Sequence, residues 1–355
     1  MQSGGLPYIC PSGGRLYGVW DTVGGTTDSN FSTGLSEEAQ PVDARLKSTR
    51  PHGGCMDTRR ALLVDAFTSD PLTGNAAGVI PDAEGLSEEA MQAIARELHA
   101  SETAFLLPSD EADRRVRYFT PTQEVELCGH ATIASHAFLA EEGVIDDGTH
   151  TLETNVGVLD IDIDDGTVWM SQDTADVNRV DADYDRVADA LGADPATLRD
   201  IGADLPLATA STGLGFLVVP VNFLKGVSAL DPDMGAVAAL TDELDVTGIY
   251  ALTFDALDAE STLHGRMFAP AAGVDEDPVT GTASGAVGAY LREVEAFDGE
   301  LPEEIVFEQG HFIDRPGRVR VRARADPVSV GGRAVTAMDG SIVVPEFEDD
   351  DIIEA

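Results

Sequence analysis

The sequence predicts an α+β protein whose folded part consists of two similar halves, each with one buried helix. First, short apolar runs typical of strands alternate with a small number of helical segments along the chain. Second, residues 129–143 form a helical segment whose first turns are small or apolar on nearly every face, which is typical of a helix inside a protein. Third, the stretch around this helix resembles a later stretch that ends at residue 291.

The first half opens with two apolar runs, residues 61–67 and 74–80, around the turn-rich TSDPLT, which predicts a hairpin. A helix is expected next at residues 86–99, with Ser87 as its N-cap and acidic residues in its first turn. The remaining expected elements of this half are strands at residues 101–108, 114–121, 151–163 and 166–173 and the buried helix at residues 129–143.

The second half repeats this order of elements. Its expected helices are residues 183–192, 231–244 and 281–295, and its expected strands are residues 208–213, 216–221, 249–255, 261–270, 304–310 and 318–325. The last two strands are expected to close the chain.

The repeat is visible when the two sequence segments are aligned. FTPTQEVELCGHATIASHAFL (residues 119–139) matches FAPAAGVDEDPVTGTASGAVGAYL (residues 268–291) once a three-residue insertion before the glycine is allowed. From Gly129 and Gly281 onward, five of eleven positions are identical, and both stretches begin with Phe-x-Pro. We therefore expect a duplication.

A duplication would let the two buried helices point their N-termini into one cleft. Unpaired N–H groups and about half a positive charge at each N-terminus would make that cleft a binding site for a carboxylate. Gly129 and Gly281 would let a substrate approach the backbone closely, with the polar His130 and Thr282 beside them. The same glycines would also suit helices that only pack against a sheet, so this pattern alone leaves a structural role open.

Charge is the unusual feature of the composition. The chain has 64 Asp and Glu against 22 Lys and Arg, a formal net charge of −42, of which only −1 falls on residues 1–55. Carboxylates spread this evenly repel nucleic acid and anionic membranes, so neither is an expected partner. We interpret the acidity as an adaptation to a salt-rich cytoplasm, typical of a halophile, because near 1 M salt a Debye length of about 3 Å screens the self-repulsion.

The folded part is expected to begin near Met56. Residues 1–55 are rich in Gly, Ser and Thr and show no helical or strand period, which predicts a disordered or spurious N-terminal extension. We divide the remainder into an N-terminal half at residues 56–180, a C-terminal half at residues 181–345 and a solvated acidic tail at residues 346–355.

Cysteine and histidine usage argues against disulfides, metals and nucleotides. Cys10, Cys55 and Cys128 are too few and too scattered for a disulfide framework or a zinc cluster, which favours a reducing compartment. The seven histidines lack metal-ligand spacing and GNAAGV lacks a nucleotide-binding pattern, so no metal or other cofactor is expected. Since no apolar run has the length of a membrane span and no signal-peptide pattern is present, we expect a cytoplasmic protein.

Five motifs together indicate a family. VDAFTSDPLTGNAAGV, ELHASETAFLLP, VRYFTPTQEVELCGHATIA, GRMFAPAAGVDEDPVTGTASGA and FEQGHFIDRPGRVRV occur in this order between about residues 60 and 325. They resemble the PhzF-like isomerases, named for phenazine biosynthesis, in the diaminopimelate-epimerase-like superfamily. The resemblance implies two pseudo-symmetric domains, each a curved, mostly antiparallel sheet around a central helix, with the site between them. It also implies a cofactor-independent enzyme, expected as a homodimer, that moves a proton on a small carboxylate-bearing molecule.

The resemblance assigns roles to particular residues. Glu102 matches the glutamate of the family's N-E-T/S-x-F pattern and would be the general acid/base, although Ser101 stands where an asparagine is common. A proton shift needs such a group, because the proton must be taken up and then returned. His130 of the Gly-His pair and Asp277 of the E-D-P-x-T-G pattern complete the expected catalytic set. The expected substrate-binding residues are Gly129, Gly281 and Thr282.

Cys128 leaves an alternative open. Racemases and epimerases of this superfamily place two thiols one residue before the two helix-opening positions, but here the second position is Thr280, whose hydroxyl is a poor base at neutral pH. We therefore expect Cys128 to be a small apolar residue at the cleft wall. A racemase that uses Cys128 with a substitute base is the second hypothesis, and a non-catalytic small-molecule binding protein is the third.

Overall fold

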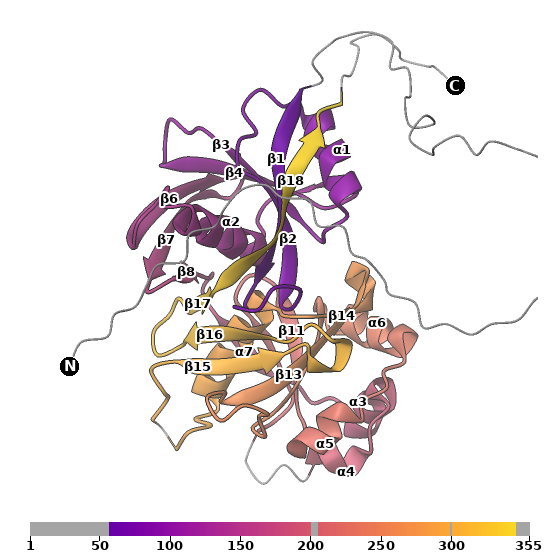
Figure 1. Cartoon of the computed structure of the whole chain (residues 1–355). Coiled ribbons are helices and arrows are strands. Elements are labelled where there is room, and N and C mark those ends of the chain that lie inside the picture. Colours follow the sequence, from indigo (N-terminus) through magenta and orange to yellow (C-terminus); the bar gives the residue numbers. More distant parts are fainter. Residues whose placement is uncertain (1–56, 200–204, 299, 346–355) are drawn as a thin grey trace, which may run out of the picture. The chain divides into compact units, whose positions relative to one another are not determined.

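The computed structural model describes residues 57–199, 205–298 and 300–345 (Figure 1). The predictions for residues 1–55 and for the acidic tail fall outside these residues. None of the described helices is long and apolar enough to cross a membrane.

The first half contains the hairpin, the amphipathic helix and the buried helix that the sequence predicts. Ser87 caps the amphipathic helix, since its hydroxyl accepts a hydrogen bond from Ala90 N at 3.2 Å. The elements are β1 (Thr58–Ala66), β2 (Asn75–Ile80), α1 (Glu88–Leu98), β3 (Thr103–Leu107), β4 (Arg114–Phe119), β5 (Glu124–Val125), α2 (Gly129–Glu141), β6 (Gly148–Thr154), β7 (Gly157–Asp164) and β8 (Thr167–Ser171).

The rest of the chain starts with β9, which lies just before residue 180 and precedes the first helix of the second half. The elements are β9 (Asp176–Arg179), α3 (Tyr184–Leu191), α4 (Pro195–Arg199), β10 (Ala208–Ser211), β11 (Gly215–Pro220), α5 (Phe223–Ser228), α6 (Met234–Glu243), β12 (Gly248–Thr253), β13 (Leu263–Ala269), the 3-10 turn η2 (Pro270–Ala272), β14 (Val274–Asp277), α7 (Gly281–Glu293), β15 (Ile305–Gln309), the 3-10 turn η3 (His311–Ile313), β16 (Gly317–Arg322), β17 (Ser329–Gly332) and β18 (Ala334–Val343).

Strand pairing repeats between the halves. In the first half β1 pairs antiparallel with β2, β2 parallel with β3, β3 antiparallel with β4, and β4 parallel with β6. In the second half β10 pairs antiparallel with β11, β11 parallel with β12, β12 antiparallel with β13, and β13 parallel with β15. The same order and the same directions in both halves confirm two pseudo-symmetric domains of a duplicated fold.

Each half also receives one strand from the other part of the chain. β18, from the C-terminal end, pairs antiparallel with β1 (Figure 1). β9 pairs antiparallel with β10. β17 pairs with β8 and thereby joins the two sheets along one edge of each. A strand from after residue 180 therefore completes the first sheet, and a strand from before residue 180 completes the second.

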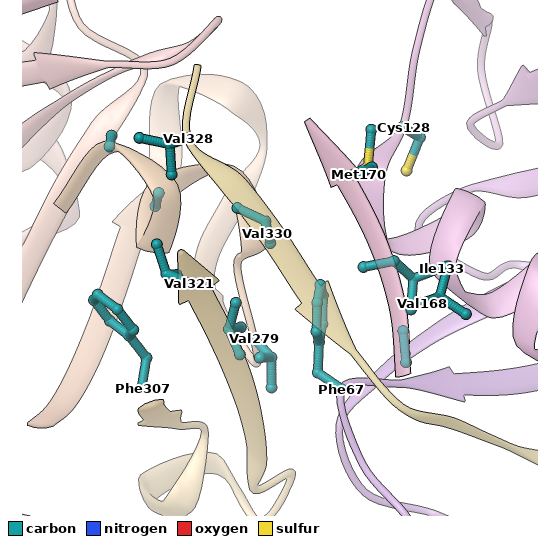
Figure 2. Packing of buried hydrophobic residues seen from close by; sticks show 14 of the residues in the cluster. Phe67, Cys128, Ile133, Val168, Met170, Val279, Phe307, Val321, Val328 and Val330 are labelled. Carbon is teal, nitrogen blue, oxygen red and sulfur yellow. The ribbon is translucent and has the colours of Figure 1, made fainter. Parts of the chain in front are cut away.

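The two central helices have equivalent surroundings. α2 packs against β1, β2, β8 and β18, and α7 packs against β10, β11, β16 and β17. One apolar cluster runs through both halves and includes Phe67, Cys128 and Ile133 from the first half and Val279 and Val330 from the second (Figure 2). Because this cluster is continuous, the N-terminal ends of the two helices are held by one core.

The sequence missed the closing strands. The chain does not end its sheet at residues 318–325, because β17 and β18 follow. The sequence SVGG of β17 shows no strand signal, yet Gly331 is needed there, since a Cβ would lie 2.4 Å from Cε3 of Trp169. β18 gains its strand conformation from pairing with β1, which lies more than two hundred residues earlier in the chain.

Candidate active site

Glu102 lies at the end of the loop that leads into β3. Its carbonyl oxygen accepts a hydrogen bond from Gly78 N of β2 at 2.9 Å, which fixes the backbone on the neighbouring parallel strand. Its carboxylate Oε2 lies 3.4 Å from Nε2 of His130, and Ser101 Oγ lies 3.2 Å from the same nitrogen. The side chains of Glu102 and His130 are 23% and 13% exposed, so both remain accessible to a small molecule.

His130 is the second residue of α2 and contacts the residue that precedes the helix. Its Nδ1 lies 3.4 Å from Sγ of Cys128. The two ring nitrogens therefore face different neighbours. A neutral imidazole with its proton on Nε2 can donate toward Glu102 or Ser101 while its Nδ1 accepts a hydrogen bond from the Cys128 thiol.

Asp277 is the last residue of β14 and is held by three side chains. Asn75 Nδ2 donates to Asp277 Oδ1 at 3.0 Å and to the carbonyl oxygen of Val279 at 2.9 Å. The Thr280 hydroxyl donates to Asp277 Oδ2, and Gln309 Nε2 donates to the Asp277 carbonyl oxygen at 2.8 Å. Asn75 of β2 and Thr280 of the loop before α7 therefore fix the carboxylate, and Gln309 of β15 fixes the backbone of the same residue.

The N-termini of the two central helices lie close together. A Cβ placed on Gly129 would lie 4.0 Å from Oγ1 of Thr282, the second residue of α7. Cys128 and Thr280 are the N-caps of α2 and α7, and neither side chain makes a cap hydrogen bond. First-turn amides without a side-chain cap are suited to bind an anion.

Electrostatics links the side chains of the two halves. Burial raises the pKa of Asp277 to about 6, with a further rise from Glu102, while the Thr280 hydroxyl and His130 act in the opposite direction. Burial also raises the pKa of the Cys128 thiol, and the carboxylates of Glu102 and Asp277 add to this effect. Cys128 is therefore a protonated thiol at neutral pH, as expected of a small residue at the wall of the site.

The structure thus brings all six expected site residues to one place. Glu102, His130 and Gly129 come from the first half, and Asp277, Gly281 and Thr282 come from the second. Cys128 is 8% exposed and Thr280 occupies the equivalent N-cap of α7, as the sequence predicts.

Sequence reasoning missed the residues that hold Asp277. Asn75 lies in GNAAGV and Gln309 in FEQG, so both are inside the motifs that indicated the family. Both side chains are uncharged amides without a nucleophile, so nothing in the sequence distinguishes them from the other residues of their motifs. Only their contacts with Asp277, Val279 and Thr280 show what they do.

Known proteins match this chain over most of its length. Residues 64–340 match the family model described as phenazine biosynthesis-like protein. An uncharacterized isomerase of Bacillus subtilis, YfhB, is 35% identical over 297 residues, which cover 82% of this chain and 98% of that relative. The trans-2,3-dihydro-3-hydroxyanthranilate isomerase of Pseudomonas aeruginosa is 32% identical over 291 residues, which cover 79% of this chain and 98% of that relative.

A solved structure shows the same fold. The Bacillus anthracis phenazine biosynthesis protein of the PhzF family matches with a TM-score of 0.74 and 32% identity, covering 81% of this chain and all of that chain. These matches confirm the predicted resemblance and the predicted fold class.

Proposed function

We propose, from the premise that the chain belongs to the phenazine biosynthesis-like family of isomerases, that Glu102 is the general acid/base of a proton shift on a small carboxylate. The observation that carries this proposal is the convergence of Glu102, His130 and Asp277 on the N-termini of two buried helices. The proposed reaction needs no external proton carrier, because one carboxylate can take the proton from one carbon and return it to another position.

The two helix N-termini would hold the substrate carboxylate. Their first-turn amides have no side-chain cap, and the positive end of each helix dipole favours an anion. Gly129 keeps the backbone at the start of α2 accessible, since a Cβ there would point toward Thr282, whereas Gly281 is required by packing, because a Cβ there would lie 2.9 Å from Cζ of Phe67. A substrate bound there would place its neighbouring carbon beside Glu102 and His130.

Asp277 would hold a proton on the opposite side of the substrate. Its pKa of about 6, raised by burial, leaves a fraction of the carboxyl protonated near neutral pH. A protonated Asp277 can donate a hydrogen bond to an oxygen on which negative charge develops. Asn75 and Thr280 keep it in one orientation for this purpose.

The racemase hypothesis receives less support from the geometry. Its chemistry needs a base on each face of the substrate, and the N-cap of α7 offers the hydroxyl of Thr280 instead of a second thiol. The raised pKa of the Cys128 thiol further weakens it as a base. Cys128→Ala should therefore keep turnover.

A deuterium-exchange screen tests the proposal. The protein is incubated in D₂O with amino acids, hydroxy acids and trans-2,3-dihydro-3-hydroxyanthranilate, and loss of C–H signals is followed by proton NMR. We expect the active compound to exchange in the wild-type protein and Glu102→Gln to slow this exchange by about a hundredfold or more. The matched control is Glu126→Gln, which changes an exposed glutamate shortly before Cys128.

Each hypothesis has its own outcome in this screen. Exchange that survives Glu102→Gln but is lost in Cys128→Ala would support the racemase. Ligand binding without any exchange in the wild-type protein would support a binding protein. The predicted homodimer and the cytoplasmic location form part of the proposal, and sedimentation of the protein in high salt checks the first.

A further inference from the structure

The candidate active site brings together three different metal-ligand types. One carboxylate oxygen of Glu102, Sγ of Cys128 and one ring nitrogen of His130 all lie within 4.8 Å of one another. The thiol sulfur is 3.4 Å from His130 Nδ1, and the carboxylate oxygen is 3.4 Å from His130 Nε2. The three atoms come from the loop before β3 and from the start of α2.

The side chains must move to surround one ion, because the thiol lies beside Nδ1 of His130 and the carboxylate beside Nε2, and one ring nitrogen binds one ion. Zinc bonds of about 2.0–2.3 Å place neighbouring ligand atoms of a tetrahedron roughly 3.3–3.8 Å apart. The three ligand atoms lie within 4.8 Å of one another, so a turn of the His130 ring and a shift of the Glu102 carboxylate would close the set on one ion. A thiolate, an imidazole and a carboxylate together form a ligand set typical of Zn²⁺, and three protein ligands leave a fourth position for water or substrate.

We propose that Glu102, Cys128 and His130 form a binding site for a thiophilic divalent cation, with Zn²⁺ as the preferred ion, and that this ion blocks the isomerase site. On binding, the Cys128 thiol releases its proton to solvent and a zinc–sulfur bond forms, without any change of oxidation state. His130 contributes a nitrogen lone pair and Glu102 a carboxylate oxygen.

The inhibitory part of this inference rests on the proposed function. An ion on Glu102 would occupy the lone pair that takes up the substrate proton. His130 would at the same time lose its freedom to contact the substrate. The metal would thus be an inhibitor of this site rather than its cofactor.

The surroundings of the thiol set the conditions for binding. The carboxylates of Glu102 and Asp277 are the acidic groups near the thiol of Cys128. The two carboxylates also attract a cation.

The duplication supplies a comparison within the molecule. The N-cap of α7 is Thr280, whose hydroxyl donates to Asp277 and is a far weaker ligand for zinc than a thiolate. Only the first half therefore presents the soft ligand.

Cobalt absorption tests the site directly, without a substrate. Co²⁺ is added to the full chain carrying Cys10→Ala and Cys55→Ala, so that Cys128 is the remaining thiol. We expect a sulfur-to-cobalt charge-transfer band in the near ultraviolet that Zn²⁺ displaces with a one-to-one endpoint. Adding Cys128→Ala should abolish the band and weaken Zn²⁺ binding by about tenfold or more, because one of three protein ligands is removed. Cys128→Ser, with circular dichroism, checks that the fold is intact.

The results separate this inference from the proposed function. Absence of the band in the Cys10→Ala/Cys55→Ala protein, or a band that persists after Cys128→Ala, would overturn the metal site whatever the enzyme does. Once the exchange assay has a substrate, Zn²⁺ should inhibit the wild-type protein and fail to inhibit Cys128→Ala at the same concentration. Equal inhibition of both proteins would also overturn it.

Discussion

Replacing Asp277 by asparagine should stabilise the protein at neutral pH while it impairs the site. Burial raises the pKa of this carboxyl from 3.8 to about 6, so the folded state binds the proton more tightly than the unfolded chain. The stability that this gives is fully present below about pH 4 and is lost as the pH rises through about 6. Asparagine resembles the protonated acid and carries no charge to bury.

The magnitude follows from the pKa difference. Each pKa unit corresponds to about 1.4 kcal/mol, so the wild-type protein should lose up to about 3 kcal/mol relative to Asp277→Asn between about pH 4 and pH 7.5. The variant can keep the contact with Asn75 through its amide oxygen, while its amide nitrogen donates to Oγ1 of Thr280. The two proteins should therefore have similar stability at the acidic end.

Denaturant unfolding in about 1 M salt measures this difference, because charge repulsion across the surface is then largely screened. The matched control is Asp275→Asn, which removes an exposed carboxylate from the same strand and should give no comparable change with pH. The reasoning is refuted if Asp277→Asn is less stable than the wild-type protein at pH 7.5, or if its advantage is the same at both pH values. Loss of deuterium exchange in the same variant would agree with its proposed role.

Two further predictions concern charge. Arg315→Met should lower the free energy of unfolding by about 3 kcal/mol, because Asp65 is 1% exposed and loses its 2.7 Å ion pair. The control is Arg318→Met, which breaks an exposed pair with Asp258 and should cost less than about 1 kcal/mol in the same denaturation assay. Equal losses in the two variants would contradict this prediction. Lowering the salt from about 1 M to about 0.1 M should reduce the melting temperature steeply, since the Debye length grows to about 10 Å around a chain of net charge −42. Equal melting temperatures in calorimetry would remove the halophile interpretation.

Sequence reasoning reached the longer helices and most strands because they depend on local patterns, whereas the short helices α4 and α5 were missed. The capping signal at Ser87 and the apolar first turns after Gly129 are readable over one or two helical turns. The match between the segments opening at Gly129 and Gly281 also predicted a duplicated fold, which the repeated strand pairing confirms. A repeat is a property of the amino-acid sequence, so it can be found without the tertiary structure.

The exchange of strands was decided by tertiary structure alone. β17 and β18 have weak local signals and are strands because β8 and β1 offer them unpaired edges. Tertiary structure also decided which residues hold Asp277 in the candidate site. Asn75 reaches Asp277 across 202 residues of sequence, and no local pattern encodes a hydrogen bond between two such distant groups.

The sequence by itself determined the two halves, their buried helices and the residues that open them, because periodicity and helix-start preferences act between near neighbours in the chain. Only the tertiary structure decided that Glu102 lies 3.4 Å from His130, and that Asp277 is buried enough for its pKa to rise. Distance and desolvation depend on which parts of the chain pack together, and that packing is set by the whole core.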